Sequence, residues 1–437
     1  MKTRFYLFLA FWSLAFSAFA MELPREVMSE KYWAFWNDDV QKKIDADIEK
    51  NRKADAVLTL SNVRKNSKID VQQISHDFQF GSNIFLFGQL GSEEKNKAYE
   101  AAFGELFNAA TVAFYWKTLE PEPGKIRFTA DSEYSYRRPP TDPVVAFCES
   151  RGLNIHGHAI IYGIRRWGHP EWMPNDRKAM EPLFEKHVQQ LAERYGDRVH
   201  QWDVVNECID QANRGIMPDD YTYKTFRWAE KYFPAKVLFS TNECDMAWGP
   251  TRRYVEIARD LKDRGAKVDL MGVQSHIFDP QGCQSIADGA KARTPEQNYA
   301  VLDCMSEAEL PIHISEVTIS APSDDEKGRL IQAIVARNLY RLWFSYPHVV
   351  RITWWNAVDG GAAPGEPSIS GLFTKDLEKK PVYHALYELI QEEWKTHLTL
   401  EAETSEVAIP FRGFRGKYRV TWTDTAGQTQ TKEIHVR

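Results

Sequence analysis

Two glutamates stand where apolar, strand-like segments of the chain end. Residues 199–207 read VHQWDVVNE, and residues 310–317 read LPIHISEV. A carboxylate at the end of a buried strand must be solvated, paired with another group or used in chemistry. Hydrolysis that retains the configuration of a sugar needs two carboxyl groups about 5–5.5 Å apart, one as acid and base and one as nucleophile. The pair therefore predicts a retaining glycosidase in which one of Glu207 and Glu316 is the acid/base and the other is the nucleophile.

Either glutamate taken alone could instead face solvent or anchor a loop, and the ends of the other strands bear on this choice. Gln-Ser-His lies between the two glutamates along the chain, and further polar or aromatic residues end the neighbouring segments. In a barrel of parallel strands, residues at the carboxyl ends of the strands line the active site. We expect these residues beside the glutamates: Asn206, Asn242, Gln274, His276 and Trp355.

Apolar segments alternate with amphipathic stretches from about residue 78 to 395. At 177–196 and 325–343 the apolar residues recur three and four positions apart, as in helices that bury one face. Eight such units predict an α/β fold, a (β/α)8 barrel, with a doubly wound open sheet as the alternative. The predicted strands cover residues 79–88, 109–115, 154–162, 199–205, 236–241, 268–274, 310–315 and 349–355.

Both flanks of this region have a different pattern. Residues 25–52 predict charged helices, whereas residues 55–75 and the tail from residue 398 alternate as strands do, with a turn at 424–427. Neither flank is long enough for a core of its own, so we expect them to pack together as a small β-rich module. The predicted division is a signal peptide (1–20), N-terminal helices and strands (21–75), the barrel (76–395) and C-terminal strands (396–437).

The first twenty residues, MKTRFYLFLAFWSLAFSAFA, combine two basic residues, a short apolar run and an Ala-x-Ala end. This pattern is typical of a secretory signal, so we expect cleavage near Ala20-Met21 and a secreted or periplasmic product. The formal net charge of −6 gives no reason to expect binding to nucleic acid or to an anionic membrane surface.

The sequence offers no sign of metal or nucleotide chemistry. It has no Gly-rich phosphate loop, HExxH, GxSxG or paired CxxC, so we expect neither a metal nor an organic cofactor. The five cysteines form no dense framework. Cys283 and Cys304 could form a disulfide in an oxidising compartment, or most cysteines could be small buried thiols.

Four segments resemble glycoside hydrolase family 10, whose best-known members are endo-β-1,4-xylanases. They are WDVVNE (202–207), GVQSHI (272–277), LPIHISEV (310–317) and ITWWNAVDG (352–360). Three further segments support the match, LEPEPGKIRF (119–128), GHAIIY (157–162) and GLFTKDLEKKPVYHAL (371–386), and all occur in the family's order. The resemblance covers nearly the whole barrel and implies a xylan or xylo-oligosaccharide substrate.

The resemblance also implies roles for matched positions, with Glu207 as the acid/base and Glu316 as the nucleophile. Asn206 would bind the 2-hydroxyl of the sugar in the −1 subsite, and Trp355 would be the floor under that sugar. The remaining matches would surround the same sugar or orient the nucleophile: His158, Asn242, Gln274 and His276.

Several positions depart from the family's pattern. Thr111, Val112 and Tyr115 replace three polar anchors of the −2 subsite, and Tyr162 replaces the Trp of a Trp-His pair. Thr318 stands in place of an Asp, which leaves His276 without its expected partner. We therefore expect bond cleavage to survive while −2 recognition differs, with the two tyrosines among the substrate-binding residues. Other candidates are Trp116, Trp167 and Trp172 for stacking and Arg165 and Arg166 for an acidic decoration, although loop arginines also commonly face solvent.

The leading interpretation is a monomeric retaining hydrolase that cleaves internal β-1,4 bonds of xylan. One alternative keeps the mechanism on another β-glycan or on short or decorated xylo-oligosaccharides. Another is a catalytically silent carbohydrate-binding barrel.

Overall fold

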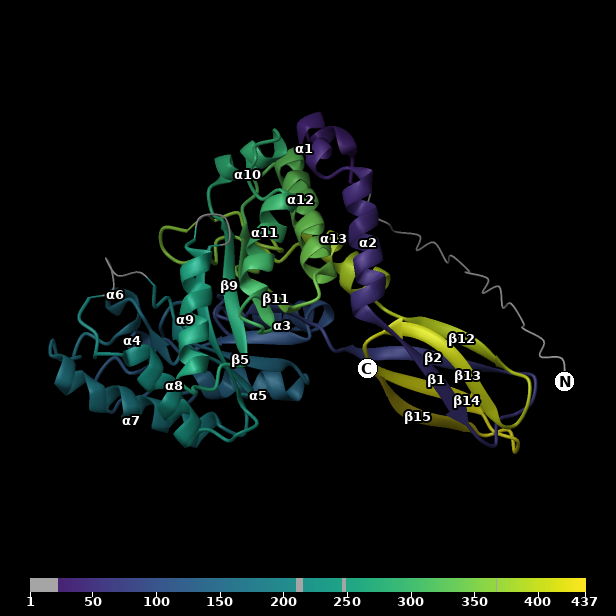
Figure 1. Cartoon of the computed structure of the whole chain (residues 1–437), viewed down its shortest axis with the longest axis horizontal. Coiled ribbons are helices and arrows are strands. Elements are labelled where there is room, and N and C mark those ends of the chain that lie inside the picture. Colours follow the sequence, from purple (N-terminus) through teal and green to yellow (C-terminus); the bar gives the residue numbers. More distant parts are fainter. Residues whose placement is uncertain (1–22, 210–214, 246–248, 367) are drawn as a thin grey trace.

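The computed structural model describes residues 23–209, 215–245, 249–366 and 368–437. Parallel strands close into a barrel, since β11 pairs with β3, and the expected (β/α)8 fold is confirmed (Figure 1). The same pairing makes the open-sheet alternative wrong. The barrel strands are β3 (Gln79–Asn83), β4 (Ala109–Ala113), β5 (Asn154–His158) with its continuation β6 (Ile161–Tyr162), β7 (Gln201–Asn206), β8 (Leu238–Asp245), β9 (Leu270–Ile277), β10 (Ile312–Ile319) and β11 (Val349–Trp354).

Helices follow the strands and cover the outside of the barrel (Figure 1). The two helices expected from periodicity are α7 and α12, and each begins after an aspartate whose side chain accepts a backbone N–H, Asp176 and Asp325. The helices of this region are α3 (Glu93–Leu106), α4 (Trp116–Leu119), α5 (Thr141–Ser150), α6 (Arg165–Gly168), α7 (Arg177–Tyr195), α8 (Tyr221–Tyr232), α9 (Thr251–Asp263), α10 (Pro280–Ala287), α11 (Pro295–Ser306), α12 (Glu326–Ser345), α13 (Pro381–Tyr387) and the π-helical turn η2 (Glu388–Glu393).

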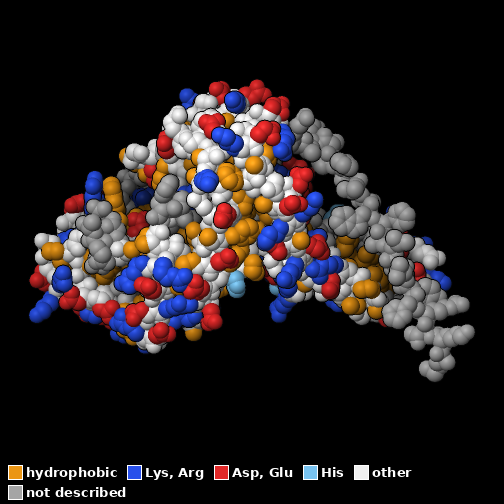
Figure 2. All heavy atoms as spheres, turned by 45° about the horizontal axis from the view of Figure 1, so that its top comes forward, with side chains coloured by type: hydrophobic (Ala, Val, Ile, Leu, Met, Phe, Trp, Pro, Cys, Tyr) orange, Lys and Arg blue, Asp and Glu red, His pale blue; other side chains and the backbone are white. Residues whose placement is uncertain are grey.

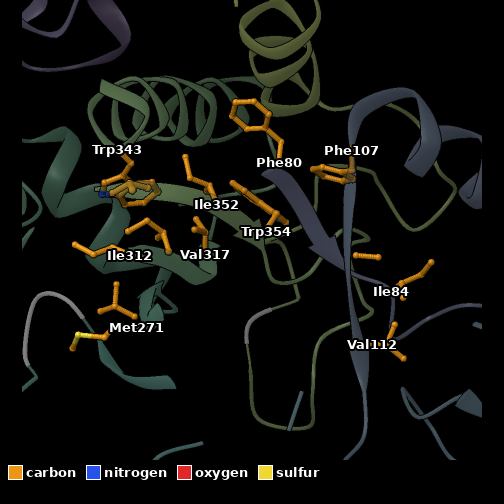
Figure 3. Close-up of a cluster of buried hydrophobic side chains, with 14 of the residues drawn as sticks. Phe80, Ile84, Phe107, Val112, Met271, Ile312, Val317, Trp343, Ile352 and Trp354 are labelled. Atoms are coloured by element: carbon orange, nitrogen blue, oxygen red, sulfur yellow. The ribbon is translucent and has the colours of Figure 1, made fainter. Parts of the chain in front are cut away.

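The main core lies between the strands and this layer of helices. Figure 3 shows Ile312 and Val317 of β10, Ile352 and Trp354 of β11, and Trp343 of α12 within one buried cluster. Their burial follows from the near-continuous apolar runs that parallel strands carry when both faces are covered.

The interior of the barrel also contains polar side chains. Arg351 of β11 is buried, and its guanidinium donates to Thr111 of β4 (3.1 Å), Gln79 of β3 (3.2 Å) and Gln201 of β7 (3.1 Å). Buried polar groups must be hydrogen-bonded, and these bonds link strands from both sides of the barrel. Several of the polar residues in the strands are therefore structural rather than open to a substrate.

The flanks form two antiparallel sheets beside the barrel, as expected (Figure 1). One sheet pairs β1 with β13, and the other has the order β12-β2-β14-β15, so strands from both ends of the chain alternate in it. The predicted turn joins β14 to β15, and its Gly427 has a φ of 84°. The strands are β1 (Lys53–Leu60), β2 (Ser67–His76), β12 (His397–Ala402), β13 (Val407–Phe414), β14 (Gly416–Thr423) and β15 (Thr429–Val436).

The N-terminal helices connect this module to the barrel. They are η1 (Arg25–Val27), α1 (Glu30–Phe35) and α2 (Asp38–Arg52), and α2 packs on α12. Arg52 at the end of α2 is buried and donates to the carbonyl oxygens of Phe344, Tyr346 and Val349. These bonds hold the barrel and the module together at one point.

The expected signal peptide lies outside the described residues. Within the described ranges, no helix is both long enough and apolar enough to span a membrane. Figure 2 shows acidic and basic side chains interspersed over the visible face. Cys283 and Cys304 are both unbonded, so the disulfide considered above is absent, and Cys283 is a buried thiol.

Candidate active site

The barrel brings the two glutamates to the same mouth. Glu207 follows β7 directly, and Glu316 lies within β10, because β10 continues beyond its apolar segment. β8 and β9 separate these two strands in the barrel. Side chains from β8 and β9 therefore stand between the two carboxyl groups.

Gln274 of β9 joins the two carboxyl groups. Its Nε2 donates to Oε1 of Glu207 at 2.9 Å and to Oε1 of Glu316 at 3.3 Å. The two carboxyl oxygens thus cannot be farther apart than the sum of these distances, about 6 Å. Retaining enzymes hold their carboxyl groups about 5–5.5 Å apart, whereas inverting enzymes need about 6.5–9.5 Å to admit a water molecule. The upper limit is shorter than an inverting enzyme needs, so the arrangement is compatible with a retaining mechanism.

Glu316 is held by several neighbours at once. Its side chain is buried, and Oε1 accepts from Nδ2 of Asn242 at 2.7 Å. His276 lies on the other side, with Nε2 3.3 Å from Oε2. Asn242 also donates to Oδ1 of Asn206 at 2.9 Å, which connects the residue before Glu207 to the same network. These bonds fix the orientation of the carboxylate, as a nucleophile requires.

Glu207 has the properties of a proton donor. Burial raises its pKa and the nearby charge of Glu316 raises it further, while hydrogen bonds from Gln274 and Tyr162 oppose the rise. A carboxyl group with a raised pKa retains its proton closer to neutral pH and can give it to a leaving group. The structure thus places Tyr162 against the glutamate for which we predict the acid/base role.

A tight turn follows Glu207. The residue has a positive φ of 55°, and its N–H donates to the carbonyl oxygen of Asn242 at 2.9 Å. Gly163 packs against this turn, where the Cβ of any other residue would collide with the carbonyl oxygen of Glu207. The glycine that replaces the family's histidine after Tyr162 therefore allows a close backbone contact.

Glu243 supports the turn from β8, and we did not predict it. One of its oxygens, Oε1, accepts the backbone N–H groups of Cys208 and Ile209, the latter at 3.0 Å. Burial raises the pKa of Glu243 to about 8. A sequence signal existed, because Asn-Glu occurs at the end of β7, where Asn206 is the last residue of the strand and Glu207 follows it, and recurs within β8 at 242–243.

His158 belongs to a buried network at the base of the site. Its Nδ1 is 2.8 Å from Oδ2 of Asp203, and its Nε2 is 3.0 Å from the hydroxyl of Tyr115. Burial opposes protonation of His158, but the bond to Asp203 and the charge of Glu316 outweigh it and raise its pKa. The same Nε2 lies 3.9 Å from Oε1 of Glu316. Asp203, an acidic residue inside an apolar strand, was also missed.

Aromatic side chains line one side of the mouth. Trp355 is only 5% exposed, and its ring meets those of Phe85 and His158 edge to face, with centroids 5.2 and 5.3 Å apart. Tyr115 packs against Phe85 and lies 5.9 Å from the ring of Tyr162. The predicted sugar floor at Trp355 is therefore bordered by the tyrosines that depart from the family's pattern.

The other two positions of the altered anchor segment are not available to a substrate. Thr111 is buried and accepts from Arg351 inside the barrel, and Val112 belongs to the main core. Of the three replacements, Tyr115 alone reaches the residues around Glu316.

Thr318 gives His276 a different partner from the aspartate that the family's pattern led us to expect. Oγ1 of Thr318 is 2.9 Å from Nδ1 of the imidazole. The backbone N–H of His276 donates to Asp245 at 2.7 Å, and Asp245 is paired with Arg293 at 2.6 Å. The histidine is thus fixed by a neutral hydroxyl in place of the expected carboxylate.

The remaining candidates have partners other than the two glutamates. Trp116 is core, stacked on His187 with ring centroids 4.1 Å apart, and Trp172 donates to the carbonyl oxygen of Glu120. Arg165 donates to the carbonyl oxygens of Met173 and Pro174, and Arg166 lies over the exposed Trp167. In the described part of the chain, no group of His, Cys, Asp and Glu could hold a metal ion.

The chain is similar to several characterised sequences. It is 24% identical over 406 residues to the anti-sigma-I factor RsgI6 of Acetivibrio thermocellus, which covers 89% of this chain and 47% of that protein. It is 25% identical over 298 residues to endo-1,4-beta-xylanase B of Thermotoga neapolitana, which covers 64% of this chain and 79% of the enzyme. The chain thus spans about half the length of the first relative.

Solved structures show the same barrel. The crystal structure of native xylanase 10B from Thermotoga maritima matches with a TM-score of 0.59 and 22% identity, over 72% of this chain and 96% of the enzyme. The model of glycosyl hydrolase family 10 matches residues 52–389, which include both glutamates and all of the barrel strands. The chain therefore belongs to glycosyl hydrolase family 10.

Proposed function

We propose that this protein is a retaining endo-β-1,4-xylanase. The observation that carries the proposal is the shared contact of Glu207 and Glu316 with Nε2 of Gln274, which limits the distance between their carboxyl oxygens to about 6 Å. The similarity to endo-1,4-beta-xylanases supports xylan as the substrate class.

In this mechanism Glu316 attacks the anomeric carbon while the bond from that carbon to the leaving oxygen breaks. Glu207 transfers its proton to the leaving oxygen, so that a neutral alcohol departs. The ionised Glu207 then takes a proton from water, whose oxygen displaces Glu316 and restores both carboxyl groups. Two inversions retain the configuration of the sugar. Asn242, Gln274 and His276 hold the nucleophile in place throughout.

The test is release of reducing ends by protein that lacks residues 1–20, from glucuronoxylan, arabinoxylan and mixed-linkage β-glucan. Glu316→Ala and Glu207→Ala should each lower activity on the xylans by about 10²-fold or more. Glu256→Ala is the matched control, since Glu256 is exposed on α9 and pairs with Arg253. Activity on β-glucan alone would refute the proposed substrate and retain the mechanism.

A carbohydrate-binding barrel without catalysis is the second candidate. One observation favours it, because a relative similar over 89% of this chain is named an anti-sigma factor rather than an enzyme. Binding of a xylan without release of reducing ends, unchanged in Glu316→Ala, would establish this candidate in place of the hydrolase.

We propose that the chain is exported, on the basis of the basic, apolar and Ala-x-Ala pattern of residues 1–20. N-terminal sequencing of protein from cells that express the full chain should find Met21 first, in the medium or the periplasm. Recovery of protein that begins at Met1 in the cytoplasm would refute export.

A further inference from the structure

Residues 133–138, here called the arginine segment, contact the loops that follow β3 and β11 and the aromatic side chains near the two glutamates. They belong to the long connection between α4 and α5. Arg127 fixes the segment, because its guanidinium donates to the carbonyl oxygens of Glu133 and Arg138. Further bonds fix it to the loops after β3 and β11: Gln89 to Ser135 (2.9 Å), Arg137 N–H to Gln89 (2.7 Å) and the Tyr136 hydroxyl to Ala362 (3.0 Å).

The segment carries two arginines but meets one carboxylate. Arg137 donates to Oδ1 of Asn356 at 3.0 Å and lies 3.6 Å from Glu366, which also accepts from Asn356. Arg138 forms no ion pair with any of the described residues, and its one side-chain hydrogen bond there is to the carbonyl oxygen of Arg137. Among the described residues, the guanidinium of Arg138 thus has no carboxylate within ion-pair distance.

Arg138 is held close to the reacting groups. Its Cζ lies 3.8 Å from the centre of the Tyr115 ring and 5.0 Å from that of Phe85. The hydroxyl of Tyr115 contacts His158, whose Nε2 is 3.9 Å from Glu316. A guanidinium stacked on a ring has a defined orientation and keeps its edge N–H groups free for a planar anion. Arg138 is thus oriented on the side of the mouth where the polar anchors of the altered subsite are missing.

We propose that Arg138 binds the carboxylate of a uronic acid on the substrate, next to the sugar that reacts at Glu316. The carboxylate would receive two parallel N–H donors from the guanidinium, and the sugar ring that carries it would lie against Tyr115. This inference rests on the proposed function, since it assigns a decoration to the same substrate. It differs from the sequence-based expectation that Arg165 or Arg166 meets an acidic decoration, because Arg165 is committed to backbone carbonyl groups.

The test compares two xylo-oligosaccharides of equal length, one neutral and one with a glucuronic acid branch. The measured quantity is the ratio of kcat/KM for the acidic substrate to that for the neutral one. We expect wild type to prefer the acidic substrate and Arg138→Gln to lower the ratio about 10- to 100-fold, the loss typical of a charge-assisted hydrogen bond. Arg138→Lys should fall between them, because lysine retains the charge without the planar donors.

Arg151→Gln is the matched control. Arg151 is exposed and stacks on Phe147 at 5.5 Å, but it precedes β5 and so lies at the opposite end of the barrel. Its ratio should equal that of wild type. A ratio unchanged in Arg138→Gln, or a wild type that prefers the neutral substrate, would overturn the inference and leave the proposed function intact.

Failure of the proposed function is recognised separately. If wild type cleaves neither substrate, calorimetric binding of the branched oligosaccharide to wild type and Arg138→Gln decides the inference. Binding that Arg138→Gln weakens at least tenfold supports the carboxylate site, and absent or equal binding rejects it. Should Arg138→Gln fail to fold, the same comparisons with Arg138→Lys apply.

Discussion

The difference in free energy of unfolding between Glu243→Gln and wild type should grow in favour of the variant as the pH rises. Both N–H groups that Glu243 accepts go to one oxygen, Oε1, and a glutamine retains that acceptor. The turn after Glu207 should therefore persist in Glu243→Gln. Glutamine resembles the protonated glutamic acid, which is the form that burial favours here, since the pKa is raised from 4.5 to about 8.

The sign and size follow from proton binding. Between pH 4.5 and about 8 the folded wild type holds a proton on Glu243 that the unfolded chain has lost. Wild-type stability thus falls by up to about 1.4 kcal/mol for each pH unit in this window. Glu243→Gln has no such titration. The free energy of unfolding of the variant minus that of wild type should therefore increase by on the order of 4 kcal/mol from pH 4.5 to 8.5.

Urea unfolding at pH 4.5, 6.5 and 8.5 measures this difference. Glu307→Gln is the control without titration in this range. Hydrogen bonding to Arg252 lowers the pKa of Glu307 from 4.5, so this carboxyl is ionised in the folded protein at all three pH values, and the difference in stability between variant and wild type should stay nearly constant. A difference for Glu243→Gln that stays constant from pH 4.5 to 8.5 would show that Glu243 is ionised in the folded protein, and would refute the reasoning. Glu243→Ala, which removes the acceptor of both N–H groups, should lower hydrolysis more than Glu243→Gln does.

Three further predictions concern the site and the flanking module. Tyr162→Phe removes a hydrogen bond that lowers the pKa of Glu207, so the basic limb of the pH profile of kcat/KM should move to higher pH; an unmoved or lower limb would contradict the assigned contact. Thr318→Val removes the hydroxyl 2.9 Å from His276 and should lower kcat by about tenfold, whereas Thr318→Ser should be close to wild type; equal values for both would mean that the hydroxyl has no role. Leu58→Ala creates a cavity in the separate core of the flanking module, where Leu58 is fully buried, and should cost about 2–5 kcal/mol in thermal or urea unfolding of that module. Loss of the proposed hydrolase activity at 25 °C in the Leu58 variant, with the barrel still folded, would show that the module acts on catalysis.

Much of the architecture could be predicted because local patterns of apolar and polar residues indicate each strand and helix. Alternation of apolar strands with amphipathic helices indicated the barrel, and each predicted strand occurs in it. The paired flanks followed from their length and alternation, although sheet order and register needed the structure. Predicted strand ends were less accurate. The strand that contains Glu316 ends at Ile319, because polar residues at a barrel mouth continue to pair with their neighbours after the apolar run has ended.

The sequence by itself determined which two glutamates follow the apolar runs of β7 and β10, since residue order and period dictate where the buried part of a barrel strand ends. It could not determine how each carboxyl group is solvated. Glu243 and Glu207 both follow an asparagine near the end of a strand, yet Glu243 is buried against the backbone of Cys208 and Ile209. In the sequence, Arg138 cannot be distinguished from other loop arginines. Only the structure shows that it stacks on Tyr115. Burial and charge balance depend on neighbours that are distant along the chain, and only the tertiary structure brings those neighbours together.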